Sequence, residues 1–232
     1  MKTQAQVVVI GGGVVGCSVI YHLTKLGWKD AVLLERSELT SGSTWHAAGG
    51  FHAMNSDPNV SRLQAYGISA YKEVEEISGQ DVGMHLTGGI QVAATEQRWE
   101  SIRYEQARHK VFGIDSHLIG PEEIKKLCPI IETKDVIGGL FDANEGHIDP
   151  YGSTHAFAKA ARKAGAEIYL NTKVEDLVHK PDGTWTVVTD KGNIDCEHVV
   201  NAAGLWAREV GKLAGIHFPV QPMERFICRT NL

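Results

Sequence analysis

The sequence has no cluster of basic residues and no long apolar run. It carries 23 Lys and Arg against 28 Asp and Glu, which gives a formal net charge of -5. A protein that binds nucleic acid usually has a basic patch or stripe, so this balance predicts no nucleic-acid partner. No apolar run approaches the roughly 20 residues that cross a bilayer as a helix, so we also predict no membrane span.

Closely spaced cysteines and metal-ligand motifs are missing as well. The four cysteines are scattered along the chain, at Cys17, Cys128, Cys196 and Cys228. The sequence holds no C-x-x-C, H-E-x-x-H or G-x-S-x-G pattern, so it indicates neither a metal site nor a serine-hydrolase elbow. Residues 1–6 lead straight into an apolar segment and do not resemble a signal peptide or presequence. We therefore expect a cytoplasmic protein, or a mitochondrial matrix protein if it is a eukaryotic form whose presequence has been removed.

The first 35 residues fit a strand–helix–strand unit. Residues 7–10 are a β-branched run, which is typical of a buried parallel strand. A glycine cluster ends this run, and residues 14–26 fit a helix that Gly27 closes. Residues 31–34 are a second apolar strand, which ends at Glu35.

The remaining pattern alternates helices with strands. Helices are predicted at 59–77, 96–112, 121–128 and 151–164, and strands at 86–94, 137–141, 167–170, 173–179, 184–189, 194–200 and 218–228. Glycine-containing turns at 181–183 and 190–192 make a β-meander of three of these strands. The order predicts an α/β fold, in which a Rossmann-like nucleotide-binding domain with a parallel sheet and a β-meander is interrupted by an inserted segment.

A glycine-rich turn follows the first predicted strand and matches G-x-G-x-x-G at Gly11, Gly13 and Gly16. Gly11 permits the tight turn, Gly13 lets the backbone approach a pyrophosphate, and Gly16 lets the helix lie close to the sheet. Glu35 lies at the end of the second strand, where an acid accepts hydrogen bonds from ribose hydroxyls. The alternatives are a glycine turn without a ligand and a merely solvated Glu35. The motif alone does not separate FAD from NAD.

The loop at residues 39–49, Leu-Thr-Ser-Gly-Ser-Thr-Trp-His-Ala-Ala-Gly, carries the strongest resemblance. It resembles the flavin loop of the dimethylglycine dehydrogenase and sarcosine dehydrogenase family, within the D-amino-acid oxidase-like flavoproteins. The resemblance implies that FAD is the cofactor and that His46 is joined covalently to its flavin ring. It also places Trp45 beside the flavin. The alternatives are a hydrogen-bonded loop histidine and an ordinary core tryptophan.

Six further residues complete the expected FAD site. The hydroxyls of Ser43 and Thr44 can serve phosphate or ribityl oxygens, and Gly49 closes the matched loop. Gly204 ends a strand and turn that resemble the second cofactor-contacting turn of the family, where it avoids a Cβ at close approach. Val174 matches the strand whose backbone contacts adenine, and Arg36 is placed to reach the adenosine ribose or phosphate. A plain turn, a structural valine and a surface arginine are the respective alternatives.

The resemblance weakens at the C-terminal end of the chain. Family proteins continue through the substrate domain and a last glycine-rich FAD segment, and some add a folate-binding region. After residues 221–224 the family commonly has a histidine and an aromatic pair, whereas this chain has Arg225 and Phe226. The predicted strand at 218–228 also has few sheet partners left in the remaining sequence. We interpret the chain as the N-terminal portion of a longer protein and expect it to be inactive alone.

The predicted organisation has four parts. Residues 1–85 and 146–215 are two pieces of an FAD-binding domain, residues 86–145 are an inserted part of an α+β substrate domain, and residues 216–232 begin a further substrate-domain segment. The implied reaction is hydride transfer from an N-methylated glycine, dimethylglycine or sarcosine, to FAD, with an electron-transfer flavoprotein or oxygen as acceptor. No acid, base or carboxylate-binding residue is assigned, and Arg225 is a candidate on charge alone.

Two other functions stay open. A non-catalytic regulatory subunit could keep the FAD-binding architecture, and the regulatory subunit of pyruvate dehydrogenase phosphatase resembles this family. The flavin-linking histidine, at His46, favours the enzyme. An NAD-dependent dehydrogenase fits the glycine motif but does not account for the loop around Trp45 and His46.

Overall fold

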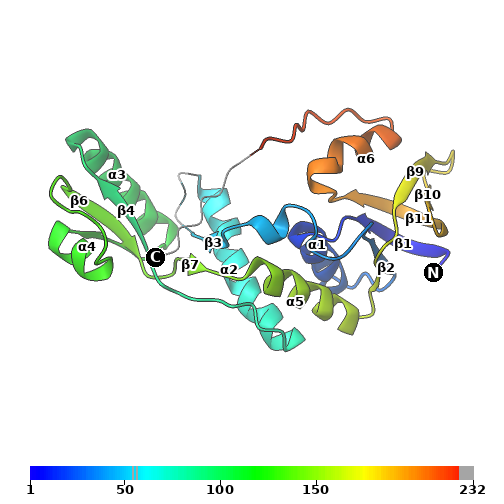
Figure 1. Cartoon of the computed structure of the whole chain (residues 1–232), viewed down its shortest axis with the longest axis horizontal. Coiled ribbons are helices and arrows are strands. Elements are labelled where there is room, and N and C mark those ends of the chain that lie inside the picture. The colour runs from blue at the N-terminus through cyan, green and yellow to red at the C-terminus, as the bar shows by residue number, and fades with distance from the viewer. Residues whose placement is uncertain (54, 56, 225–232) are drawn as a thin grey trace. The chain divides into compact units, whose positions relative to one another are not determined.

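The computed structural model describes residues 1–53, 55 and 57–224. These residues form two compact units (Figure 1). The first unit holds residues 1–47, 77–80 and those from 150 onward, and the second holds residues 48–76 and 81–149. The predicted division has other boundaries, because residues 48–76, 81–85 and 146–149 cluster with the inserted segment, and residues 216–224 cluster with the first unit. No helix of the described chain combines the length and the apolar character that crossing a membrane requires.

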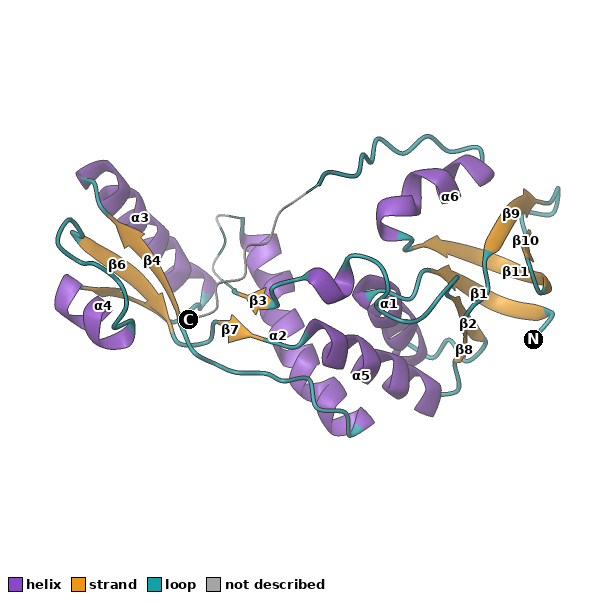
Figure 2. Ribbon diagram, viewed as in Figure 1, coloured by secondary structure: helices purple, strands orange, loops and turns teal. Residues whose placement is uncertain are grey.

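A six-stranded sheet forms the centre of the first unit (Figure 2). Its strands are β1 (Gln4–Ile10), β2 (Ala31–Leu34), β8 (Glu167–Tyr169), β9 (Val174–His179), β10 (Trp185–Thr189) and β11 (Gly192–Asn201). They lie in the order β8-β2-β1-β11-β10-β9. The first four pair in parallel, while β11, β10 and β9 form an antiparallel meander. This arrangement confirms the predicted fold, a parallel sheet with a β-meander.

Helices cover the sheet because its central strands are apolar on both faces. The helices of this unit are α1 (Val14–Lys25), α5 (Pro150–Lys163) and α6 (Ala207–Leu213), with short 3-10 turns η1 (Thr44–His46) and η2 (Gly204–Trp206). Val8 packs in one apolar cluster with Val32, and Val210 and Leu213 of α6 pack against that cluster. Val7 is also almost fully buried, and side chains alternate along a strand, so it faces the opposite side. There α1 packs against α5 and β2. Each such buried aliphatic side chain stabilises the fold by about 1.5–3 kcal/mol.

The second unit contains a three-stranded antiparallel sheet. Its elements are β3 (Gly50–Phe51), α2 (Pro58–Ser78, whose last two residues belong to the first unit), β4 (Gly89–Ala93), α3 (Glu96–Phe112), β5 (Ser116–Ile119), α4 (Pro121–Leu127), β6 (Gly138–Asp142) and β7 (Gly146–His147). The sheet order is β4-β6-β5, and β3 pairs only with β7. Ala93, Ile102 and Leu140 form a small core between α3 and the sheet.

Caps set the ends of α3, which has the predicted bounds. The Thr95 hydroxyl accepts a hydrogen bond from the Arg98 N–H at 3.2 Å and so satisfies one N–H at the helix start. Gly113 ends the helix with a φ of 73°, which a side chain would disfavour.

The predicted strand at 218–228 is not found where the structure describes it. Residues 218–224 form no regular element, and residues 225–228 lie outside the described residues. Pro219 and Pro222 explain the difference, because proline has no N–H to donate to a neighbouring strand. The candidate Arg225 also lies outside the described residues.

The carboxyl group of Glu145, in the second unit, titrates near neutrality. Burial and the neighbouring Asp142 carboxylate raise the pKa of Glu145 from 4.5 to about 7, while His52 opposes the shift. A raised folded pKa favours the protonated native state. The stabilisation is therefore complete below about pH 4.5 and is lost as the pH rises through about 7.

We expect Glu145→Gln to remove this pH dependence. The amide stays neutral, so the variant should melt at a higher temperature than the parent above pH 7 and at a similar temperature near pH 4.5. Thermal unfolding between pH 4.5 and 8 measures the difference. Glu100→Gln, at an exposed position of α3, is the matched control. Parallel melting curves of the parent and Glu145→Gln across this range would refute the expectation.

Candidate cofactor site

The glycine turn lies at the carboxyl ends of three parallel strands. The Gly11 N–H donates to the Leu34 carbonyl at the end of β2, at 2.9 Å. The Ala202 N–H, just after β11, donates to the Ile10 carbonyl at the end of β1, also at 2.9 Å. Open α/β sheets bind their ligands at this edge, where strand connections diverge to the two sides.

Gly11 and Gly16 are required by the packing of the chain itself. Gly11 has a φ of 116°, and a Cβ there would lie 2.4 Å from the Ala202 carbonyl oxygen. A Cβ on Gly16 would lie 1.9 Å from the Gly11 carbonyl oxygen. Both contacts are far too short for a real side chain, so these glycines hold the strand, the turn and α1 close together. These are the reasons that the sequence predicted for the two residues.

Gly13 adjoins a hydroxyl group at the start of α1. It precedes the helix with a φ of -78° and a ψ of 179°, and a Cβ there would lie 2.9 Å from Thr44 Oγ1. The same oxygen accepts a hydrogen bond from the Val14 N–H at 3.1 Å. Gly13 therefore lies beside one hydroxyl and the N-terminus of α1, and a helix N-terminus suits the oxygens of a phosphate.

Gly12 also belongs to the turn, although the motif did not single it out. A Cβ there would lie 2.8 Å from Leu39 Cδ2 and 2.9 Å from the Glu35 Cβ. The sequence did contain a signal for Gly12, namely three consecutive glycines. The motif uses Gly11 and Gly13 and does not explain the glycine between them.

Glu35 is a buried acceptor and not a solvated acid. It is 9% exposed, and its Oε2 accepts the Gly12 N–H at 2.7 Å. Its Oε1 accepts the Ser37 N–H at 2.9 Å. An ionised carboxylate has about four lone-pair sites, so each oxygen keeps capacity for a ligand hydroxyl. Glu35 thus shapes the turn and stays competent to bind a ribose.

A cavity of about 400 Å³ opens beside the turn. It is lined by Ile10, Gly11, Leu34, Glu35, Arg36, Thr172, Lys173, Val174, Glu175, Ala203, Trp206, Glu209, Val210 and Leu213. Four predicted residues therefore lie together, namely Gly11, Glu35, Arg36 and Val174. The Arg36 guanidinium lies 3.7 Å from the centre of the Trp206 ring, a cation–π contact that builds one wall. The size and the mixed polar and apolar lining fit the adenosine part of a dinucleotide.

The loop after Leu39 folds back onto the turn. The Thr40 N–H donates to the Gly12 carbonyl at 3.0 Å, and Thr40 is buried with a φ of 70°. Leu39 is buried as well, against Gly12. With the bond from Val14 to Thr44, the loop is held to the turn at two points before it reaches His46.

Trp45 and His46 form an exposed aromatic pair. Their ring centres lie 3.7 Å apart, and Trp45 is 57% exposed. Trp45 is therefore not a core tryptophan, the alternative that the sequence left open. His46 Nδ1 forms a hydrogen bond with the Gly42 carbonyl at 3.2 Å, and the His46 N–H donates to the carbonyl of the exposed Ser43 at 3.2 Å. The pair is thus placed where a flat ligand can reach it.

Gly204 and Gly49 both have a left-handed backbone conformation. Nothing in the described chain lies within 4 Å of a Cβ on Gly204, so no protein atom requires a glycine there, and its close approach to a cofactor stays a prediction. The φ of 53° at Gly204 explains the glycine instead, and Ala202 makes the close contact with the turn. Gly49 belongs to the second unit, where it has a φ of 77° and its carbonyl accepts the Ile148 N–H at 3.0 Å.

The buried thiols near the sheet are not reactive groups. Burial raises the pKa of Cys17 to about 12, and burial, with the Asp195 carboxylate second, raises that of Cys196 to about 11. Thiolate is the reactive form, so these cysteines are inert at neutral pH. Among residues 1–53, 55 and 57–224, no three His, Cys, Asp or Glu side chains gather in a way that could hold a metal ion.

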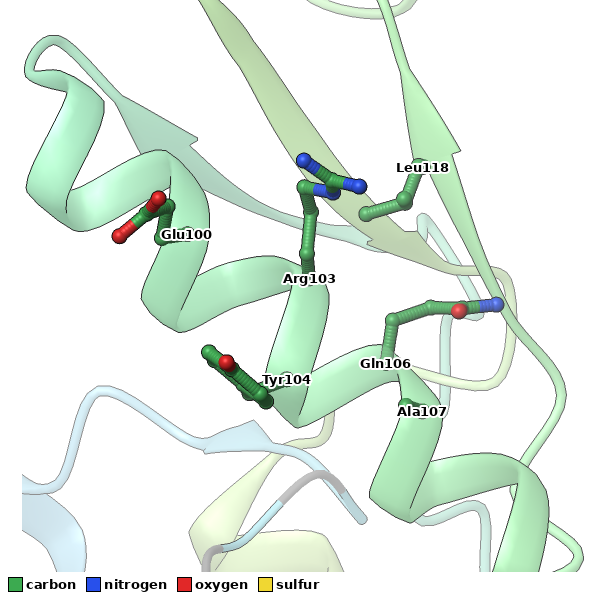
Figure 3. Close-up of a pocket in the computed structure, with 6 residues that line it drawn as sticks. All are labelled: Glu100, Arg103, Tyr104, Gln106, Ala107 and Leu118. Carbon is green, nitrogen blue, oxygen red and sulfur yellow. The ribbon is translucent and has the colours of Figure 1, made fainter.

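A separate hollow of about 450 Å³ lies on the second unit (Figure 3). It is lined by Glu100, Arg103, Tyr104, Gln106, Ala107 and Leu118. The Arg103 side chain points toward Leu118, and Tyr104 is 74% exposed. None of the residues that the sequence predicted for the site lies in it.

We expect Glu35→Gln to weaken the binding of ADP. The amide is neutral and has one acceptor oxygen, which the Gly12 or Ser37 N–H would occupy, so no charged acceptor would remain for a ribose hydroxyl. Losing one hydrogen bond to a charged acceptor costs about 1.5–3 kcal/mol. The affinity for ADP, measured by calorimetry, should fall about 10- to 100-fold. Glu38→Gln, at an exposed position three residues on, is the control. Equal affinities for the two variants would remove Glu35 from the site.

Three known proteins are similar to this chain in sequence over nearly its whole length. The human dimethylglycine dehydrogenase is 44% identical over 223 residues, which cover 96% of this chain and 26% of that protein. Human sarcosine dehydrogenase is 37% identical over 96% of this chain and 25% of that protein. The mouse pyruvate dehydrogenase phosphatase regulatory subunit is 36% identical over 100% of this chain and 26% of that protein. The chain therefore spans about a quarter of the length of these relatives.

A solved structure and a family pattern extend the comparison. The L-proline dehydrogenase from P. horikoshii superposes with a TM-score of 0.86 at 28% sequence identity, over 93% of this chain and 57% of that one. The family described as FAD dependent oxidoreductase, abbreviated DAO, matches residues 6–232. That match covers nearly the whole chain and includes the glycine turn, the loop with His46 and the turn after β11. The chain therefore belongs to the DAO family of FAD-dependent oxidoreductases.

Proposed function

We propose that the protein containing this chain is an FAD-dependent dehydrogenase of an N-methylated glycine, either dimethylglycine or sarcosine. The observation that carries the proposal is the loop at residues 39–49, which is held to the glycine turn and presents Trp45 and His46 to solvent. The relatives named for these two substrates are 44% and 37% identical to the chain. Their names support the substrate class and leave both methylated glycines open.

The residues of this chain would hold the cofactor by its adenylate half. Glu35 would accept hydrogen bonds from the ribose hydroxyls, and the N-terminus of α1 would face the pyrophosphate. Arg36 and Trp206 wall the adenine side, and Val174 offers backbone groups to the base. When bound, FAD would supply the acceptor for a hydride from an N-methyl carbon, and water would then convert the oxidised substrate to formaldehyde and the demethylated amine.

The loop would hold the flavin half. Ser43 and Thr44 offer hydroxyls to phosphate or ribityl oxygens, and Gly49 and Gly204 leave room beside the ligand. We propose that His46 attaches the flavin covalently and that Trp45 packs beside it. After acid precipitation of the flavin-loaded full-length protein, yellow colour and flavin fluorescence should stay with the pellet. Complete release of flavin into the supernatant would overturn the covalent link.

Turnover tests the substrate class. The full-length protein, loaded with FAD under anaerobic conditions, is mixed with dimethylglycine, sarcosine or glycine. Bleaching of the flavin absorbance with the methylated compounds, together with formaldehyde formation, is the expected result. Glycine lacks the N-methyl carbon and should give no formaldehyde. Flavin that is reduced by glycine as fast as by both methylated compounds would refute the proposal.

Partners and location follow the same proposal. An electron-transfer flavoprotein would accept the electrons, and a folate-binding region would lie outside this chain. Relatives named as mitochondrial enzymes support a matrix location in a eukaryote. Reduction of a purified electron-transfer flavoprotein by the substrate-loaded protein tests the acceptor.

A regulatory subunit is the second candidate, because one such subunit is 36% identical over the whole chain. A regulatory protein can keep the dinucleotide fold without turnover, so it does not need the exposed His46. Absence of flavin reduction by every methylated glycine, together with a changed activity of a partner phosphatase, would favour this candidate.

A further inference from the structure

We propose that Thr44 is a positioning residue that couples the pyrophosphate end of the site to His46. The inference rests on the proposed function, because it concerns the same dinucleotide site. It names a role that the glycine motif and the loop resemblance do not assign, namely the transmission of phosphate occupancy to the histidine.

The first observation is the hydrogen bond between the loop and α1. The first N–H groups of a helix have no partner within the helix. Gly13, the residue before α1, has no side chain to serve as a cap. Thr44 takes that role from 30 residues away, since its Oγ1 accepts the Val14 N–H at 3.1 Å. A Cβ on Gly13 would lie 2.9 Å from the same oxygen, so the hydroxyl lies against the turn.

The second observation is the direction of the hydroxyl proton. A threonine hydroxyl accepts through its lone pairs and donates one proton. The oxygen is already an acceptor for Val14, so its proton remains to donate to another acceptor. A phosphate oxygen at the N-terminus of α1 is such an acceptor. Thr44 would then accept from the helix and donate to the ligand at the same time.

The third observation is the rigid connection from Thr44 to His46. Both residues belong to the single 3-10 turn η1, in which the Ala47 N–H donates to the Thr44 carbonyl at 3.2 Å. The Gly42 carbonyl holds the His46 ring through Nδ1 at 3.2 Å. A ligand contact that shifts the Thr44 hydroxyl therefore also shifts the three-residue turn that ends at His46.

ADP separates this coupling from direct contact with a flavin. It carries the pyrophosphate but neither the ribityl chain nor the flavin ring, so its effect on His46 cannot come from contact with a flavin. The reaction of diethyl pyrocarbonate with His46, followed by mass spectrometry of the peptide, reports how freely the imidazole reacts. We expect saturating ADP to slow this reaction about threefold or more, the factor that one hydrogen bond of ordinary net strength provides.

Substitutions at Thr44 identify the hydroxyl as the cause. Thr44→Val keeps the shape and loses the hydroxyl, so ADP should no longer change the rate at His46. Thr44→Ser keeps the hydroxyl and should retain the effect. Thr24→Val removes a hydroxyl at the far end of α1, where it donates to the Tyr21 carbonyl, and should behave like the parent. The reaction of the exposed His179 serves as an internal reference in every sample.

The outcomes distinguish this proposal from the proposed function. An ADP effect at His46 that persists in Thr44→Val, or is absent from the parent although ADP binds, overturns the coupling alone. Failure of ADP to bind the parent protein in a calorimetric titration overturns the dinucleotide site and the coupling together. Circular dichroism of each variant confirms that the fold is retained, and Thr44→Ala, which also removes the hydroxyl, takes the place of Thr44→Val if that variant does not fold.

Discussion

Replacing His46 with alanine is expected to leave the full-length protein with no covalently attached flavin. The His46 imidazole is exposed, and only alanine's methyl group would remain in its place. The glycine turn, Glu35 and the adenosine cavity are untouched by the change. Non-covalent affinity for FAD should therefore stay within about tenfold of the parent, a difference of about 1.4 kcal/mol. Denaturing gel electrophoresis with flavin fluorescence measures the attached fraction, and equilibrium dialysis measures the affinity.

His179→Ala is the matched control for this prediction. His179 also lies against a tryptophan, with its ring centre 4.5 Å from that of Trp185, but at the outer edge of the sheet. Its replacement should leave the attached flavin unchanged. A fluorescent protein band of full intensity from the His46→Ala variant would show that another residue makes the bond.

Gly11→Ala is expected to destabilise the first unit more than any exposed substitution. Two costs combine at this position. A φ of 116° strains any side chain by about 1–3 kcal/mol. The new Cβ would also lie 2.4 Å from the Ala202 carbonyl oxygen, and overpacking of this kind costs a further 1–3 kcal/mol, roughly. The sum, about 2–6 kcal/mol, is a large fraction of the stability of an ordinary domain, about 5–15 kcal/mol, and the distorted turn should also weaken ADP binding.

Gly27→Ala separates the two costs. Gly27 has a φ of 95°, and no described atom lies within 4 Å of the position of its Cβ. Gly27→Ala therefore has the backbone strain of a positive φ but no steric clash. Urea unfolding of the ligand-free proteins gives both free energies of unfolding. If Gly11→Ala lowers the free energy of unfolding no more than Gly27→Ala does, the turn can move away from Ala202 at little cost.

Local patterns predicted the elements whose boundaries are set by neighbouring residues. The helix at 96–112 has the predicted limits because Thr95 and Gly113 cap it within the sequence. Strand β5 was missed because its residues are buried, exposed, exposed and buried, a pattern without the alternation of a half-buried strand. Strands β3 and β7 are two residues long and exist through their pairing with each other, which no local pattern records.

The site was predicted where it follows from the motif and missed where distant segments meet. Gly11 and Gly16 have the local roles that a strand–turn–helix unit assigns to them, and Glu35 follows the second strand as predicted, while its contact with a ribose stays a prediction. The contact of Arg36 with Trp206 joins residues about 170 positions apart, and the contact of Ala202 with Gly11 joins residues about 190 apart. Such contacts depend on sheet order, which the spacing of residues along the chain does not contain.

The sheet order also sets when the cofactor cradle can form during synthesis. Strand β1 is made well before its partner β11, because Val8 pairs with Val199, about 190 residues later. At about 5–20 residues per second, a ribosome needs about 10–40 s to make that interval. Throughout this time one edge of β1 lacks its native neighbour and is open to wrong pairing or to a chaperone. The glycines that would receive the pyrophosphate are thus made before Ala202, which supports their turn in the folded protein.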